Sequence, residues 1–245
     1  MNKLSKETLN IITVAAIAIV VLNLINHETK KNFEKSVIEV VKKNPDAFRT
    51  ALGQGQRPSA PPNEEDQLKD ALANKVQVDL GNTPVLGKPD AAIMIVVFSD
   101  FQCPFSKRGA ETINALKQKY GDKLNFVYKN LPLPFHPEAM PSARAALAAS
   151  KQGKFYEYHD KLFENQTQLG EDTYVKIAQE LGLNMEKFNT DRNSKEIEDQ
   201  IKKESEQANS LGFNGTPAFA LNGVKILGAY PVEHFEKIIS ALGLS

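Results

Sequence analysis

One cysteine, Cys103, carries the clearest chemical signal in this sequence of 245 residues. It follows the apolar run Ala91 to Phe98, which predicts a buried strand, and it precedes Pro104 at the first turn of a predicted helix. Free amide N–H groups and the positive end of the helix dipole stabilise a thiolate at such a position. We therefore expect an ionised, outward-facing nucleophile, although an isolated cysteine is usually a small buried apolar residue.

The count of metal-binding side chains limits the other chemistry. A single thiol forms neither a disulfide within the chain nor a zinc site built from several thiolates, so any disulfide must involve a second molecule. The four histidines are too scattered to indicate a metal site: His27, His136, His159 and His234. The sequence also contains no Gly-rich phosphate loop. We expect no metal and no bound cofactor.

Composition indicates a globular protein that does not bind nucleic acid. The sequence is 41% apolar and 24% charged, which suffices for one sizeable core and excludes a wholly disordered or fibrous chain. Thirty Lys plus Arg balance thirty Asp plus Glu, and no basic stripe is interleaved with aromatic residues. Nothing here would attract a phosphate backbone.

The first 27 residues are predicted to form a signal or anchor helix. The run Ile11 to Ile25 is apolar apart from Thr13 and Asn23, which is typical of a membrane-directed helix. It spans roughly 22 Å, less than the ~30 Å of bilayer hydrocarbon, so a cleavable signal is an alternative. Residues 26–29 offer no small-x-small cleavage site, which favours an uncleaved single span.

Residues 28–75 are predicted to form a helical stalk and a linker. Apolar residues recur at three- and four-residue steps between Phe33 and Leu52, as on a one-sided helix. The stretch GQGQRPSAPPN, residues 53–63, predicts a linker, and a short helix is expected over Glu64 to Asn74. An apolar stripe outside a globular domain must bury against something. Self-association through residues 30–52 is our hypothesis, with docking onto the chain's own domain as the alternative.

Residues 76–245 predict an α/β domain. The order of strand, helix and strand around Cys103 favours a right-handed parallel unit. Helical signals fill an insert at about 138–212, and an amphipathic helix near the end closes the chain. Asn222-Gly223 predicts a hairpin turn. The predicted strands are Val76 to Leu80, Ala91 to Phe98, Leu124 to Leu131, Pro217 to Leu221 and Val224 to Leu227.

Four features in this order resemble the DsbA-like branch of the thioredoxin superfamily. They are Phe101-Gln-Cys-Pro-Phe-Ser106, the segment LPLPFHPEAM at 131–140, the helical insert, and GTPAFALNG at 215–223. The resemblance covers residues 76–245 and implies a thioredoxin-like fold with an inserted helical domain. The stalk segment VIEVVKKNPDAF at 37–48 also resembles the amino-terminal helix of DsbA-like proteins that oligomerise.

The resemblance implies roles for the residues that match the family's motifs. Cys103 corresponds to the attacking cysteine. Thr216-Pro217 corresponds to the threonine and cis-proline that face this cysteine and align a substrate strand, whereas the sequence alone also permits a plain turn proline. Pro104 and Phe105, inside the cysteine motif, are expected to contact the substrate.

Ser106 departs from the family, which usually has its second, resolving cysteine there. A serine hydroxyl is far too weakly acidic to act as a second sulfur, so the chain alone is not expected to oxidise a dithiol. We expect Ser106 to hydrogen-bond the Cys103 thiolate. A mixed disulfide at Cys103 must then be resolved by another thiol of the substrate, by a small thiol, or by a partner protein.

Three other polar residues receive structural interpretations. Asp100 lies near Cys103 in sequence and is expected to be a solvated turn residue. His136 follows the second strand of the parallel unit, within reach of the active site, and is expected to be structural. His159 lies in an aromatic-rich helix and is expected to contribute packing.

The sequence therefore predicts a thiol-disulfide oxidoreductase or isomerase that acts through Cys103 on cysteine-containing proteins, with a membrane or small-thiol redox partner. We expect a single-pass protein of the bacterial inner membrane with its catalytic domain on the periplasmic side. That side follows from the resemblance, because lysines after the apolar run outnumber those before it and oppose export. The alternatives are a glutathione-dependent small-molecule transferase or isomerase, and a noncatalytic binding module.

Overall fold

The structure is a computed structural model that describes residues 32, 35, 38–44 and 64–244. The chain divides into two units, Met1–Asn63 and Glu64–Ser245. In the first unit, residues 38–43 are helical, as the sequence predicts for this part of the stalk. The expected anchor at 1–27 and the linker at 53–63 lie outside the described residues. Within the described ranges, no helix has the length and apolar character that crossing a bilayer would require.

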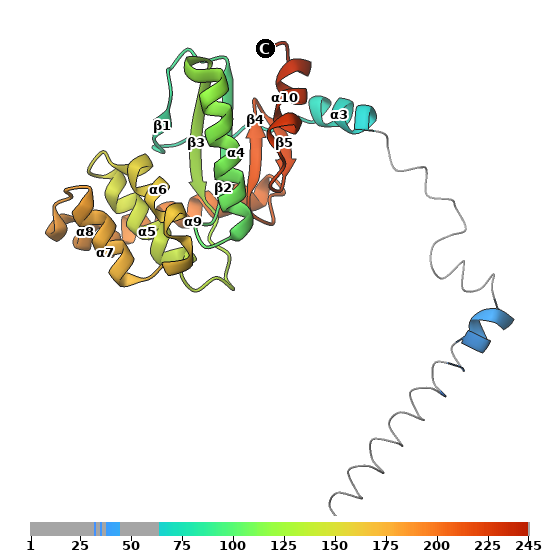
Figure 1. The fold of residues 1–245 in the computed structure, drawn as a ribbon, viewed down its shortest axis with the longest axis horizontal. Coiled ribbons are helices and arrows are strands. Elements are labelled where there is room, and N and C mark those ends of the chain that lie inside the picture. The colour runs from blue at the N-terminus through green and yellow to red at the C-terminus, as the bar shows by residue number, and fades with distance from the viewer. Residues whose placement is uncertain (1–31, 33–34, 36–37, 45–63, 245) are drawn as a thin grey trace, which may run out of the picture. The chain divides into compact units, whose positions relative to one another are not determined.

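A mixed sheet of five strands forms the centre of the second unit (Figure 1). The strands lie in the order β1-β3-β2-β4-β5, where β2 and β3 are parallel and the other neighbours are antiparallel. This arrangement confirms the predicted parallel unit and the hairpin around Asn222-Gly223. The strands are β1 (Val85–Leu86), β2 (Ile93–Ser99), β3 (Leu124–Asn130), β4 (Ala218–Leu221) and β5 (Val224–Leu227).

The predicted edge strand over residues 76–80 is not formed. The backbone N–H of Val76 donates to the carbonyl of Gly223 (2.8 Å), but the segment joins no ladder. Val76, Val78 and Leu80 instead pack against buried residues on one face of the sheet. The alternation in the sequence therefore reflects burial of every second side chain, and the edge position belongs to β1.

Strand β2 is apolar from Ile93 to Phe98 because helices cover both faces of the sheet. Ile93, Ile95 and Val97 of β2 join the larger buried cluster, to which helices α4 (Pro104–Tyr120) and α10 (Val232–Ala241) contribute. Val96 and Phe98 point the other way and join the cluster that includes Ala208 of α9 (Lys195–Ser210). The strand that leads to Cys103 is thus fixed from both sides.

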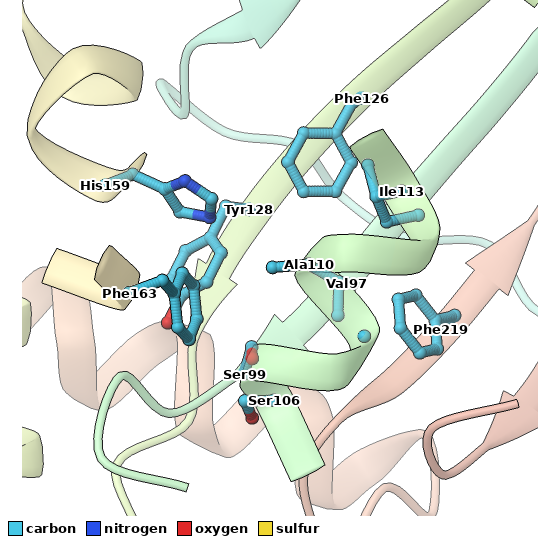
Figure 2. Close-up of a pocket in the computed structure, with 11 residues that line it drawn as sticks. Val97, Ser99, Ser106, Ala110, Ile113, Phe126, Tyr128, His159, Phe163 and Phe219 are labelled. Atoms are coloured by element: carbon cyan, nitrogen blue, oxygen red, sulfur yellow. The ribbon is translucent and has the colours of Figure 1, made fainter. Parts of the chain in front are cut away.

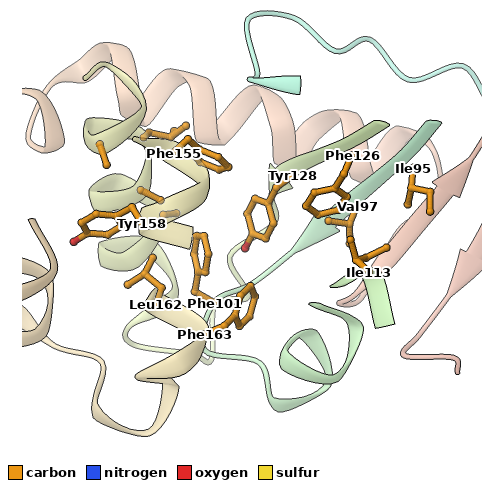
Figure 3. Close-up of a cluster of buried hydrophobic side chains, with 14 of the residues drawn as sticks. Ile95, Val97, Phe101, Ile113, Phe126, Tyr128, Phe155, Tyr158, Leu162 and Phe163 are labelled. Carbon is orange, nitrogen blue, oxygen red and sulfur yellow. The ribbon is translucent and has the colours of Figure 1, made fainter. Parts of the chain in front are cut away.

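Helices fill the chain between β3 and β4, where the sequence predicts an insert at about 138–212. The insert groups at one end of the sheet in Figure 1. Figure 3 shows side chains of α6 and of the sheet in one continuous apolar cluster, in which the Phe101 and Phe163 ring centroids lie 5.2 Å apart. Besides α9, the α-helices of the insert are α5 (Ala139–Ser150), α6 (Phe155–Glu164), α7 (Glu171–Glu180) and α8 (Met185–Arg192). A 3-10 turn, η2 (Gln166–Gln168), follows α6. The predicted short helix before the domain is α3 (Glu64–Ala73).

Glu204 of α9 ties the insert to the end of β3. Glu204 is 4% exposed, and its Oε2 accepts hydrogen bonds from the backbone N (2.7 Å) and Nδ2 (2.8 Å) of Asn130. Oε1 accepts from Thr83 Oγ1 (3.3 Å) and Gln200 Nε2 (3.0 Å). Because Asn130 begins the loop that approaches the active site, this carboxylate helps to set the position of that loop.

Replacing Glu204 with leucine is expected to destabilise the chain by about 2–4 kcal/mol. The change leaves the buried Asn130 amide groups without their acceptor, which costs more than the loss of an exposed ion pair. Urea unfolding of the full chain measures the effect. Glu206→Leu is the matched control, because Glu206 lies on the same helix, is exposed and forms an exposed ion pair with Lys202 (3.8 Å). Equal losses in the two variants would contradict the role given to Glu204.

Candidate functional site

Cys103 occupies the junction between β2 and α4, as predicted. It is the N-cap residue of α4, with extended backbone angles (φ −71°, ψ 122°), and Pro104 is the first helical residue. Its carbonyl accepts from the backbone N–H groups of Ser106 (3.0 Å) and Lys107 (3.3 Å), which closes the first turn. The sulfur therefore lies at the positive end of a 17-residue helix.

The Thr216-Pro217 segment faces the cysteine across 113 residues of sequence. The Thr216-Pro217 peptide bond is cis, and the Cys103 thiol donates to the Thr216 carbonyl (Sγ to O, 3.4 Å). Gly109 permits the approach, because a Cβ there would lie 3.0 Å from Pro217 Cγ. The structure thus brings together the two motifs that the sequence picked out separately.

The expectation of an outward-facing sulfur is wrong. Cys103 is only 3% exposed, because Thr216 and the turns around it cover the side chain. Pro104 and Phe105 of the same motif are exposed, Phe105 by 52%. The nucleophile candidate therefore lies just beneath the surface, beside exposed apolar groups.

Ser106 does not make the expected hydrogen bond to Cys103. It is 1% exposed, and its hydroxyl accepts from the backbone N–H of Asp100 (3.4 Å). At the third position of α4 the hydroxyl points back to the loop that precedes the cysteine. Ser106 thus contributes to the position of that loop in this structure.

Asp100 is buried, which corrects the expectation of a solvated turn residue. It is 2% exposed; Oδ1 accepts from the Gln102 N–H (2.8 Å) and Oδ2 from the Leu133 N–H (2.9 Å). His136 Nδ1 contacts the same Oδ2 (2.7 Å). His136 therefore reaches the active-site region, as a partner that links the loop after β3 to the loop before Cys103.

Gln166 is a site residue that the sequence analysis missed. Its Nε2 donates to the carbonyls of Phe101 (2.7 Å) and Cys103 (2.9 Å), so one side chain from η2 in the insert holds both ends of the active-site turn. Nothing in the local sequence signals this contact, because it joins residues 63 and 65 positions apart. The insert thereby contributes directly to the position of the sulfur.

Gln166→Leu is expected to lower the free energy of unfolding by about 1–3 kcal/mol and to change the alkylation rate of Cys103, since the turn loses two hydrogen bonds. Urea unfolding and iodoacetamide kinetics on the folded chain measure the two effects. Gln168→Leu is the control, because Gln168 is an exposed residue of the same 3-10 turn. Alkylation rates identical to wild type in both variants would show that Gln166 does not position the cysteine.

His159 lies beneath the active-site turn. Its ring packs edge-on to Phe101, Tyr128 and Phe163, with centroid distances of 5.6, 4.9 and 5.0 Å, which supports the packing role expected from the sequence. Burial lowers its pKa, and the neighbouring Asp160, 2.8 Å from Nδ1, only partly opposes this. The imidazole is therefore neutral at pH 7.

The stability of the chain is expected to fall as the pH drops below about 6.5. The unfolded chain binds a proton at His159 near that pH, whereas the native chain, with its lowered pKa, does not. Acid therefore favours unfolding by up to about 1.4 kcal/mol per pH unit until the native pKa is reached. Urea unfolding at pH 7.0 and 5.5 tests this, with His159→Phe as the comparison; the same pH dependence in both chains would refute the assignment.

Among the described residues, no group of three or more His, Cys, Asp or Glu side chains is arranged to hold an ion. The chemistry available at this location is that of one sulfur, a facing carbonyl and the amide end of a helix.

The sheet order, the cysteine at the start of α4 and the cis-proline opposite it define a thioredoxin-like fold. A family model described as thioredoxin matches residues 79–241. The chain belongs to this family, and the resemblance stated from the sequence is confirmed at that level.

Solved structures agree with the assignment. A thioredoxin-like oxidoreductase from Silicibacter pomeroyi DSS-3 is 29% identical, with a TM-score of 0.62 over 72% of this chain and 98% of that one. The thiol-disulfide exchange protein alpha-DsbA2 from Wolbachia pipientis is 22% identical, with a TM-score of 0.60 over 72% of this chain and 92% of that one. The latter similarity concerns the fold alone.

A curated relative shares only part of its length with this chain. The Na(+)/H(+) antiporter NhaA 1 of Mycolicibacterium vanbaalenii is 31% identical over 160 residues, which is 64% of this chain and 26% of the antiporter. The chain thus spans about a quarter of the curated relatives it matches.

Proposed function

We propose that this protein is a thiol-disulfide oxidoreductase or isomerase that acts through one nucleophile, Cys103. The observation that carries the proposal is the 3.4 Å contact between the sulfur at the start of α4 and the carbonyl of Thr216. A protein of the same fold that is described as a thiol-disulfide exchange protein supports it. An extended substrate segment beside Thr216 and Pro217 would bring its disulfide against Cys103, with Pro104 and Phe105 as exposed contacts.

The exchange proceeds through a mixed disulfide. The Cys103 thiolate attacks one substrate sulfur, a Cys103–substrate bond forms, and the other substrate sulfur leaves as a thiolate that takes up a proton. A second thiolate, from the substrate or from a small thiol such as glutathione, then attacks the mixed disulfide and releases Cys103. Resolution by the substrate is isomerisation without net oxidation. Resolution by an external thiol leaves that thiol in a mixed disulfide with the substrate, and a second equivalent of the thiol, leaving with the first as their disulfide, completes the two-electron reduction of the substrate.

The proposal extends to location and partners. We place the domain on the periplasmic side of the bacterial inner membrane, because protein disulfides persist in oxidising compartments. Its partners would be cysteine-containing proteins and a membrane or small-thiol redox partner. Self-association through residues 30–52 belongs to the same proposal.

Refolding of a model protein with mispaired disulfides tests the function. With a low concentration of glutathione, the full chain should accelerate the recovery of correct pairing. Without any added oxidant, it should not oxidise a reduced substrate stoichiometrically. Conjugation of glutathione to small electrophiles, with no effect on mispaired proteins, would instead favour the small-molecule enzyme.

A further inference from the structure

A small cavity lies beneath the active-site turn and plays no part in the exchange chemistry. Figure 2 shows His159 from α6, Tyr128 from β3, Ser99 from the end of β2 and Ser106 from α4 around this cavity. Aromatic and aliphatic side chains, among them Phe163, complete its walls. Polar groups from four separate elements thus converge inside the apolar core.

Two of these polar groups are buried without a hydrogen-bond partner among the described residues. They are the hydroxyl of Tyr128, a residue 1% exposed, and Nε2 of His159, a residue 4% exposed. Burial raises the pKa of the Tyr128 hydroxyl, and the nearby Ser99 opposes this rise. The Tyr128 and Ser99 hydroxyls nevertheless do not reach hydrogen-bond geometry. Buried donors and acceptors in native proteins are almost always paired, with protein groups or with ordered water.

The protonation of the lining groups can be assigned from their contacts. Asp160 Oδ1 lies 2.8 Å from His159 Nδ1. Burial raises the pKa of the Asp160 carboxyl, but the hydrogen bond to His159 outweighs this effect, so the pKa is lowered overall. An ionised carboxylate only accepts, so Nδ1 carries the proton and Nε2 presents a lone pair. The pKa of Tyr128 is raised, first by burial, so its hydroxyl keeps its proton and donates.

We propose that this cavity binds one internal water molecule, which accepts from the Tyr128 hydroxyl and donates to His159 Nε2. The cavity offers about 10 Å³ to the centre of a water molecule, close to the roughly 10–15 Å³ that one buried water needs. The two serine hydroxyls can complete its four hydrogen bonds. Since Ser106 also accepts from the Asp100 N–H, the water joins His159 to the turn that carries Cys103.

A crystal structure of the full chain, at a resolution where internal waters are ordered, tests the proposal directly. It should show a density peak within about 2.7–3.2 Å of both the Tyr128 hydroxyl and His159 Nε2. A cavity without such a peak would overturn the proposal. A direct hydrogen bond between Tyr128 and His159 would overturn it as well.

Nitrogen NMR on the full chain with ¹⁵N-histidine gives a second test in solution. The His159 ring should be the neutral tautomer with the proton on Nδ1, its Nε2 resonance should be shifted upfield by a hydrogen bond, and the shift should shrink in Tyr128→Phe. Tyr156→Phe is the control: its ring also faces His159, at 6.0 Å, but its hydroxyl donates elsewhere, to the carbonyls of Pro84 (2.7 Å) and Phe126 (2.9 Å). An Nε2 resonance at the position of a free acceptor, unchanged by Tyr128→Phe, would contradict the proposed water.

Discussion

Cys103→Ser is expected to reduce thiol-disulfide exchange to the uncatalysed background while leaving the fold intact. The serine hydroxyl is not a nucleophile toward disulfides at neutral pH, and the sequence contains no other cysteine. Serine is also a favoured N-cap residue, so helix α4 should begin as well in the variant as in the wild type.

Recovery of correct pairing in a mispaired model protein measures the first effect, and urea unfolding measures the second. The free energy of unfolding should change by less than about 1 kcal/mol. Ser106→Ala is a matched comparison, since it alters a buried residue of the same turn but keeps the sulfur. Unchanged exchange in Cys103→Ser would remove Cys103 from the mechanism.

Ser106→Cys is expected to convert the chain into a dithiol oxidant. Residues three apart on a helix are neighbours, so the new thiol lies on the same turn as Cys103. A disulfide between the two cysteines would accept two electrons from a reduced substrate, whose two thiols become a disulfide while Cys103 and the new cysteine return to thiols, without another oxidant.

The measurement is stoichiometric oxidation of a reduced peptide by the preoxidised variant, with mass spectrometry of the 103–106 disulfide. Ser210→Cys is the control for an added thiol, because it places a cysteine on an exposed turn of α9, remote in sequence. A variant that forms the internal disulfide yet oxidises no substrate would show that the site is not arranged for exchange.

Local signals predicted the elements that carry the site. The continuous apolar run from residue 91 predicts a strand that is covered on both faces, because only such a strand buries every side chain. Pro104 predicts the start of a helix, because proline suits the first helical turn. The hairpin was equally readable, because Asn222 and Gly223 adopt the positive φ values, 45° and 87°, that this turn needs.

Local sequence patterns do not predict the contacts between distant segments. The burial of Asp100 depends on His136 and Leu133, and the active-site turn depends on Gln166; no periodicity or spacing specifies these pairs. The burial of Cys103 has the same origin, since its cover comes from Thr216. The family resemblance indicated that Thr216-Pro217 would face the sulfur, but it did not indicate how closely.

Residues 76–80 show how a local pattern can be misread. Alternating apolar residues meet the same condition whether the segment pairs in a ladder or lies across a sheet face with every second side chain buried. In this chain the second arrangement holds for Val76, Val78 and Leu80. Only the neighbouring strands, which the pattern does not contain, decide between the two.

The most direct test compares the reaction of Cys103 with a peptide disulfide in the folded chain and in the chain unfolded by urea. Mass spectrometry identifies the mixed disulfide and stopped-flow measurement gives its rate of formation. We predict that the folded chain reacts at least about tenfold faster, because the site would orient the peptide disulfide beside the sulfur and the covering contact with Thr216 yields to a substrate. A sulfur that reacts only as fast as the chain unfolds would contradict the account.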